Sequence, residues 1–211
     1  EPVAYHAEWL QAYRPNAQFY LSEAQRLALH EASGHRALEP AGTYARKVYN
    51  RLLIDLSYNS SRLEGNTYSL IETEKLIVEG IASEGKLSDE KIMILNHKEA
   101  IRHLVDQAQS IQVDTDEICT LHYLLSDGLV PPQYAGKLRD HSVRISASSY
   151  LPLNDFMALT SQLRQVCTFA KAITDPFEQS FFLLVHIAYL QAYNKLLHEQ
   201  LFFVSPQVYA R

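Results

Sequence analysis

Apolar residues recur at intervals of three and four along most of the chain, which is the spacing that places them on one face of an α-helix. One such face runs through Tyr49, Leu52, Leu53, Leu56 and Leu63. Similar faces are formed by Ile92, Leu95, Ile101, Leu104 and Val105, by Ile118, Leu121, Leu124 and Leu125, and by Phe156, Leu159, Leu163, Val166 and Phe169. From Phe177 to Tyr193 the sequence is apolar almost all round, so we expect a central, buried helix. The pattern predicts an all-α fold.

Polar and glycine residues mark the ends of several of these helices. Gly65 is a candidate left-handed C-terminal cap. Ser69, with Glu72 three residues later, has the spacing of a capping box and predicts a helix that ends near Gly80. Further boundaries are expected after Ser88 or Asp89, at Asp127-Gly128, and at Asn154 or Asp155.

The clearest helix start comes before the last apolar run. Asp175 can act as the N-cap, Pro176 fits the first helical position, and Glu178 lies in the first turn, where a negative charge is favourable. The tail from Leu196 to Arg211 has no clear periodicity, so the pattern does not assign it an element.

Residues 142–153 follow a different pattern from the helices around them. Val143, Ile145 and Tyr150 are β-formers, and small residues lie between them. A short β-hairpin is the element that this segment predicts, although its turn has no glycine.

Composition narrows the functional classes. Only 7 of the 211 residues are glycine, and none follows Gly136. An average chain of this length would carry roughly 15. A glycine-rich phosphate loop needs paired glycines at fixed spacing, so the sequence excludes the Rossmann and P-loop kinds. The hydrophobic fraction of 47% and charged fraction of 20% are those of a globular domain.

Charge, cysteine content and the length of the apolar stretches add further expectations. The net charge of −5 gives no basic field for nucleic acid. Cys119 and Cys167 are the only cysteines, and neither belongs to a C-x-x-C pair, which argues against a disulfide framework or a thiolate zinc site. No apolar stretch is long enough to span a bilayer. We therefore expect a cytoplasmic protein without a membrane partner.

Two stretches of the sequence together resemble one family. Ser60, Glu64 and Gly65 occupy the fixed places of the pattern [ST]-x-x-x-E-[GN]. About 125 residues later, the segment from His186 to Tyr193 is similar to the residues that precede and begin the motif H-x-F-x-[DE]-G-N-[GK]-R-x-x-R. Both patterns are typical of the Fic (Fic/Doc) family. The intervening residues Asn96, Ala100, Gly136, Arg139, Val143, Ile145, Tyr150 and Pro152 also resemble that family.

The resemblance implies a helical core with a small β-hairpin flap. It divides the chain into an N-terminal helical extension at 1–45, a Fic-like core at 46–195 and a tail at 196–211 that it does not assign. Within the core it implies an inhibitory helix at 49–65, a flap at 141–153 and a central helix at 176–193.

The activity implied by the resemblance is transfer of AMP from ATP, with Mg²⁺, to a hydroxyl group of a target protein. The implied inhibitory residues are Ser60, Glu64 and Gly65. The residues implied to dock the target are Val143, Arg144, Ile145 and Ser146. The residues implied to bind the nucleotide are Asn194 and Lys195, and Gln191 occupies the position of the catalytic histidine. A second copy of the chain is another candidate partner, and DNA is expected only through a C-terminal domain that this sequence does not include.

The sequence departs from the motif at several positions. Gln191 replaces the histidine, and a glutamine cannot take a proton at neutral pH. Tyr193 stands for the motif phenylalanine, and Asn194-Lys195 follows at once, without the acidic residue that would hold the metal. No metal ligand and neither motif arginine is visible in this stretch. Two explanations remain open: the motif has degenerated, or residues of the natural protein are missing between Tyr193 and Asn194 and after Lys195.

Two functional hypotheses follow. The first is an AMP-transferring, nucleotide-binding protein that is autoinhibited through Glu64. The second is a non-catalytic binding or regulatory module with the same fold, which has lost its base at Gln191. Simpler interpretations stand beside them: Glu64 as a solvated residue at a helix end, and His186 as a core histidine with satisfied hydrogen bonds.

Overall fold

The computed structural model describes residues 2–33, 41–107, 110–145 and 148–194, and for 41–48 it describes the backbone alone. Its helices within these ranges are α1 (Ala7–Ala12), α2 (Glu23–Ser33), α3 (Ala41–Leu63), α4 (Leu70–Glu79), α5 (Ser88–Asp106), α6 (Thr115–Ser126), α7 (Phe156–Ala172) and α8 (Pro176–Leu190). Two strands of two residues each, β1 (Val3–Ala4) and β2 (Tyr150–Leu151), are the only sheet in the described ranges. The predicted all-α class is therefore confirmed.

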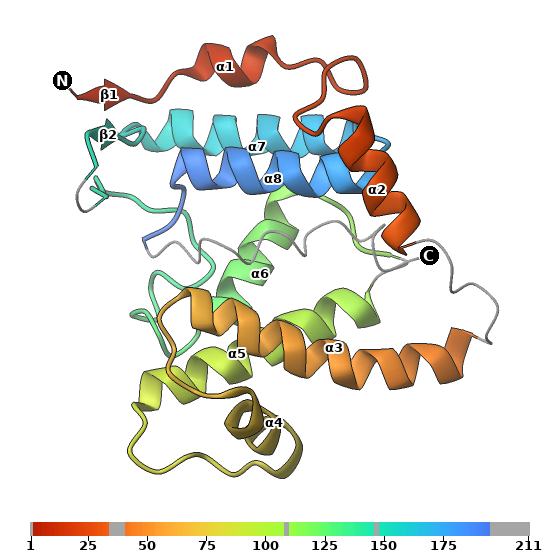
Figure 1. Ribbon diagram of the computed structural model, residues 1–211. Helices are drawn as coiled ribbons and strands as arrows, with labels where there is room; N and C mark the ends of the chain where they lie inside the picture. The colour runs from red at the N-terminus through yellow and green to blue at the C-terminus, as the bar shows by residue number, and fades with distance from the viewer. Residues whose placement is uncertain (1, 34–40, 108–109, 146–147, 195–211) are drawn as a thin grey trace.

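The helices form two packed groups joined by α6. Helices α7 and α8 lie side by side, α1 runs along their outer side, and α2 packs on α8 (Figure 1). The second group consists of α3, α4 and α5, and α6 packs on both α5 and α7. The main core lies around α8, whose Phe182, Leu183 and Leu190 are fully buried. The expected central, buried helix is thus α8.

Most of the predicted helix ends are confirmed. The Ser69 hydroxyl accepts a hydrogen bond from the Glu72 amide, while the Glu72 carboxylate accepts one from the Ser69 amide. Gly80 ends α4 in the left-handed conformation. Asp155 and Asp175 are the N-caps of α7 and α8. Helix α5 includes Ser88 as its first residue, because the carboxylate of Glu90 caps the amide of Leu87.

Two boundaries of the implied core differ from the expectation. The inhibitory helix was expected at 49–65, and α3 instead begins at Ala41 and ends at Leu63. The central helix was expected to reach Tyr193, but α8 ends at Leu190 because Gln191 adopts the left-handed conformation, with φ of 51°. The tail at 196–211 lies outside the described residues.

The hairpin expected at 142–153 is wrong in its pairing. Strand β2 pairs in parallel with β1, with Val3 opposite Tyr150 and Ala4 opposite Leu151. Residues 142–145 belong to no strand. The carbonyl groups of His141 and Leu153, at the two ends of the segment, are bound by the Arg139 side chain. The N-terminal segment and Arg139 thus form hydrogen bonds with main-chain groups that would pair with each other in a hairpin.

The N-terminal segment is fixed to α8 by one buried side chain. The carboxylate of Glu178, fully buried in the first turn of α8, accepts hydrogen bonds from the Tyr13 hydroxyl and from the amides of Tyr20 and Leu21. The sequence suggested only a helix-end charge for Glu178. In the structure it holds the connection between α1 and α2 on the core. None of the described helices has the combined length and apolarity that crossing a membrane requires.

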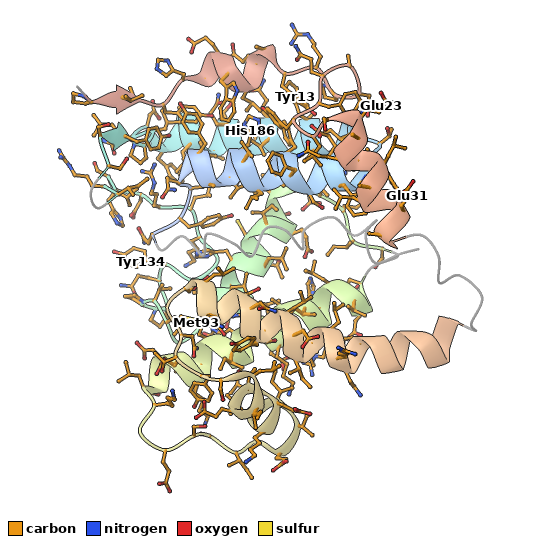
Figure 2. All side chains as sticks on the ribbon, in the orientation of Figure 1. Tyr13, Glu23, Glu31, Met93, Tyr134 and His186 are labelled. Carbon is orange, nitrogen blue, oxygen red and sulfur yellow. The ribbon has the colours of Figure 1, made fainter. Side chains whose placement is uncertain are left out.

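His186 is a core histidine, as the simpler interpretation had it. It is 1% exposed, its Nε2 shares a hydrogen bond of 2.8 Å with the Tyr20 hydroxyl, and its ring packs against Trp9 and Phe182 between α1 and α8 (Figure 2). Burial lowers the pKa of His186 to about 4. The protonated form of this side chain is therefore disfavoured in the folded protein.

The stability of the fold is expected to fall as the pH falls from 6.5 to 4, partly because of His186. His186 binds a proton near pH 6.5 in the unfolded chain and only near pH 4 in the folded chain. Between these values, each unit of falling pH therefore lowers the free energy of unfolding by about 1.4 kcal/mol through this group. Urea unfolding at several pH values measures how steeply the free energy of unfolding changes with pH. The His186→Leu variant is less stable at pH 7 but should lose stability less steeply with acid. Equal slopes in the two proteins would contradict this role.

Candidate functional site

The turn that follows α8 carries the residues that the motif resemblance assigned to catalysis and nucleotide binding. Gln191 begins it, and Ala192 and Tyr193 are buried in the main core. The Tyr193 ring stacks on His122, with ring centres 4.0 Å apart, and its hydroxyl lies 3.6 Å from Cys119 Sγ. Burial raises the pKa of Tyr193 well above its usual value. Tyr193 thus anchors the turn in the main core.

Asn194 is the last described residue of this turn and has an unusual environment. Both polar atoms of its side chain, Oδ1 and Nδ2, are buried and have no hydrogen-bond partner among the described residues. A buried amide without a partner costs about 1–3 kcal/mol. Such a group is uncommon in folded proteins and calls for an explanation. Lys195 lies outside the described residues.

Gln191 is held close to its own helix. Its backbone is in the left-handed conformation, and its side-chain Nε2 donates to the carbonyl of Ala188 at 2.6 Å. The side chain is largely buried. A carboxamide in this arrangement can accept or donate a hydrogen bond, but it cannot remove a proton from an attacking hydroxyl.

Arg139 connects this turn with the segment expected to form the flap. Its Nε donates to the Gln191 carbonyl at 2.6 Å, and its backbone amide donates to the Ala192 carbonyl at 3.0 Å. The remaining guanidinium nitrogens donate to the carbonyls of His141, at 2.9 Å, and Leu153. Arg139 is 3% exposed, and burial lowers the pKa of its guanidinium. In the sequence, Arg139 is only one of the intervening residues that resemble the family, and nothing in the local pattern indicates these contacts.

Gly136 brings the segment before Arg139 close to α6. Its φ of +70° is left-handed, and its amide donates to Nδ1 of His122 at 3.0 Å. A Cβ added at this position would lie 2.8 Å from Cβ of Tyr123 and 3.0 Å from the Cys119 carbonyl oxygen. The backbone can pass this close to α6 only because residue 136 has no side chain.

The candidate docking residues lie between the two ends held by Arg139. Val143 and Ile145 are half-buried and Arg144 is exposed, while Ser146 lies outside the described residues. The Ser142 hydroxyl donates to Oδ1 of Asn154 at 2.7 Å. This hydrogen bond joins the two ends of the segment, and Val143, Arg144 and Ile145 lie between them in the sequence.

The candidate inhibitory residues lie at the C-terminal end of α3. Ser60 is buried and Glu64 is half-buried. The Gly65 amide donates to the Arg62 carbonyl and the Asn66 amide to the Ser61 carbonyl, which is a Schellman arrangement with Gly65 at φ of +89°. The expected left-handed cap at Gly65 is confirmed.

Asn66 fixes this helix end to α5. Its Nδ2 donates to the Glu90 carbonyl at 2.7 Å, and its Oδ1 accepts from the Tyr68 amide at 2.9 Å. The Glu90 carboxylate accepts from the amides of Thr67 and Leu87. These contacts hold the backbone at Glu64 in one position. The local sequence pattern did not indicate this role for Asn66, although Asn66 directly follows Gly65.

The structure brings some of the predicted site residues together and separates others. Arg139 joins the turn of Gln191 and Asn194 to the base of the candidate flap. Ser60, Glu64 and Gly65 belong to the other helix group, where α3 packs on α4 and α5. The C-terminal ends of α3 and α8 point to the same side of the molecule (Figure 1). Among the described residues, no group of three or more His, Cys, Asp or Glu side chains is arranged to hold a metal ion.

Comparison with known proteins gives a likeness in structure only. No family model matches the sequence, and no curated protein matches it. Among solved structures, a fragment of Fic-1 from C. elegans has a TM-score of 0.68 at 17% identity, over 88% of this chain and 56% of that chain. A Fic family protein from Desulfovibrio desulfuricans has a TM-score of 0.68 at 12% identity, over 93% and 59%.

A third similar structure is a Fic domain-containing signalling protein from Bacteroides thetaiotaomicron. Its TM-score is 0.67 at 14% identity, over 87% of this chain and 72% of that chain. The chain spans less than two thirds of the length of the first two structures. With α8 at the centre of a helical core and a short strand in the segment before α7, the chain has the fold of the Fic-domain proteins.

Proposed function

We propose that this chain binds ATP at the turn after α8 and transfers AMP to a hydroxyl group of a target protein. The observation that carries the proposal is the buried carboxamide of Asn194, which has no partner among the described residues. A phosphate oxygen of a bound nucleotide would accept a hydrogen bond from its Nδ2 and remove the cost of the unpaired group. Likeness to Fic-domain structures supports the same class of ligand.

The described residues do not fit a magnesium site. Magnesium in nucleotide sites is usually held by one or two carboxylates together with phosphate oxygens. Residues 191–194 carry no carboxylate. In the transfer, the target hydroxyl would form a bond to the α-phosphorus and pyrophosphate would leave, while the hydroxyl proton would pass to water because Gln191 cannot accept it.

Glu64 is the proposed inhibitory residue of this site. A carboxylate that faces a bound triphosphate repels its charge, and in a partly buried site this repulsion is worth about 1–2 kcal/mol. The Schellman arrangement and the contacts of Asn66 support this role, because they fix the backbone at Glu64.

The Glu64→Gly variant is therefore expected to transfer label from α-labelled ATP to protein about tenfold faster than the wild type, by loss of that repulsion. The measurement is label incorporation into added cell protein and into the chain itself. Glu79→Gly is the matched control, because Glu79 also precedes a left-handed glycine at a helix end. If no protein is labelled by the wild type or by Glu64→Gly, the transferase proposal is wrong.

A second candidate function is nucleotide binding without transfer. One contact bears on it: the Gln191 side chain, which takes the position of the family's histidine, donates its Nε2 hydrogen to the Ala188 carbonyl. Under this alternative, Glu64→Gly would bind ATP more tightly than the wild type and label no protein. Measuring both ATP binding and protein labelling for the wild type and Glu64→Gly therefore distinguishes the two functions.

A further inference from the structure

Arg139 is a buried cation whose side-chain hydrogen bonds, within the part of the chain that the structure describes, all go to main-chain carbonyls. Its three side-chain bonds end at Gln191, His141 and Leu153, and no ion pair to a carboxylate is found for it among the described residues. Keeping a guanidinium at 3% exposure without a counter-charge is costly. The three carbonyls are therefore arranged to offset that cost.

The three carbonyls belong to the two sides of the proposed site. Gln191 starts the turn that ends in Asn194, whereas His141 and Leu153 are the two ends of the candidate flap. The backbone amide of Arg139 adds a bond to Ala192 in the same turn. One residue thus sets the spacing between the proposed nucleotide turn and the proposed docking segment.

A second set of contacts holds the flap end against α8 from another direction. The Tyr150 hydroxyl donates to the Tyr189 carbonyl at 2.6 Å, and the Tyr150 ring stacks on Tyr189. Val3 donates its amide to the Ser149 carbonyl at 3.0 Å. These contacts fix residues 149–151, but none of them reaches residues 191–194. Among the described residues, only Arg139 hydrogen-bonds both to the two ends of the flap, at His141 and Leu153, and to the turn, at Gln191 and Ala192.

We propose that Arg139 is a positioning residue that couples the flap to the nucleotide turn and thereby sets the geometry in which Asn194 meets its ligand. The inference rests on the proposed nucleotide site. An arginine is required because its planar group has donors in a fixed fork that can reach three acceptors at once, which a lysine ammonium on a flexible stem cannot. Arg139 does not touch the nucleotide itself.

The test compares Arg139→Lys and Arg139→Met in the full chain, with Asn16→Ala as the control. Asn16 also makes three hydrogen bonds, to Ala172 and Thr174 at the opposite end of α8, so its loss destabilises the fold away from the site. ATP affinity is measured by calorimetry, and hydrogen exchange is followed in residues 148–154 and 191–194.

Both Arg139 variants are expected to weaken ATP binding about tenfold or more, because small misplacements of a site are costly, while Asn16→Ala stays within about twofold of the wild type. If Arg139→Lys retains its affinity and Arg139→Met does not, the charge acts directly and the proposal is wrong. If both retain it, the role of Arg139 is structural only, which also contradicts the proposal.

Hydrogen exchange separates failure of this inference from failure of the proposed function. A wild type that binds no ATP would contradict the nucleotide site. Coupling would still be supported if Arg139→Lys raised exchange in both segments together while Asn16→Ala raised it in neither. An increase confined to one segment, or shared by the control, would overturn the coupling.

Discussion

Replacing Glu178 with alanine is expected to lower the free energy of unfolding by about 4 kcal/mol, because three donors lose their acceptor in a buried place. The donors are the Tyr13 hydroxyl, at 3.0 Å, and the amides of Tyr20 and Leu21, at 2.7 and 3.0 Å. Glu178→Gln keeps one acceptor oxygen and should lose about half as much. Urea unfolding followed by far-UV circular dichroism measures both losses.

Trp9 gives this experiment a local readout. It is the only tryptophan of the chain and packs on His186 and Tyr20, next to the segment that Glu178 holds. In Glu178→Ala, the fluorescence of Trp9 should change at a lower urea concentration than the helical signal. Glu31→Ala, which alters an exposed carboxylate of α2, should change stability by less than about 0.5 kcal/mol. Equal midpoints for Glu178→Ala and Glu31→Ala would contradict the role of Glu178.

Gly136→Ala is expected to lower the free energy of unfolding by about 4 kcal/mol, and Gly85→Ala by about 1 kcal/mol. Both glycines have a similar left-handed φ, +70° and +76°. An added Cβ meets no atom within 4 Å at Gly85 but overlaps Tyr123 and the Cys119 carbonyl at Gly136. The difference between the variants therefore measures the close approach alone.

Urea unfolding of the two variants under the same conditions gives this difference. Gly136→Ala should also weaken the packing of Tyr193, because Gly136 holds His122, on which the Tyr193 ring stacks. Losses of equal size at the two positions would mean that the segment can move away from α6 without cost, contrary to the account given for Gly136.

The helices could be predicted because their signals are local. A capping side chain and its target lie within three residues, as in Ser69 with Glu72 or at Asp175, and a core face repeats every turn. The early end of α8 at Leu190 was not predictable in this way. It depends on the Gln191 and Ala192 carbonyls being bound by Arg139, which lies more than fifty residues earlier.

The predicted hairpin was wrong for the same reason, because the true partner strand is distant in the sequence. Residues 142–153 have β-forming residues, but the partner of Tyr150 and Leu151 is the N-terminal pair Val3 and Ala4, which no local pattern indicates. In the candidate site, Glu64 and Gln191 were proposed from the resemblance alone, and their roles stay predictions. The residues that hold them, Asn66 and Arg139, act through main-chain atoms, and such contacts leave no spacing rule in the sequence.

Binding of ATP at the turn after α8 is the central claim, and titration calorimetry of the full chain tests it most directly. We expect Glu64→Gly to bind one ATP per chain and the wild type to bind ATP more weakly. The double variant Glu64→Gly/Asn194→Ala should bind ATP about tenfold more weakly than Glu64→Gly, which is the loss expected when a ligand gives up one hydrogen bond to a buried amide. Absence of binding by Glu64→Gly, or binding that does not change when Asn194 is replaced, would contradict the claim.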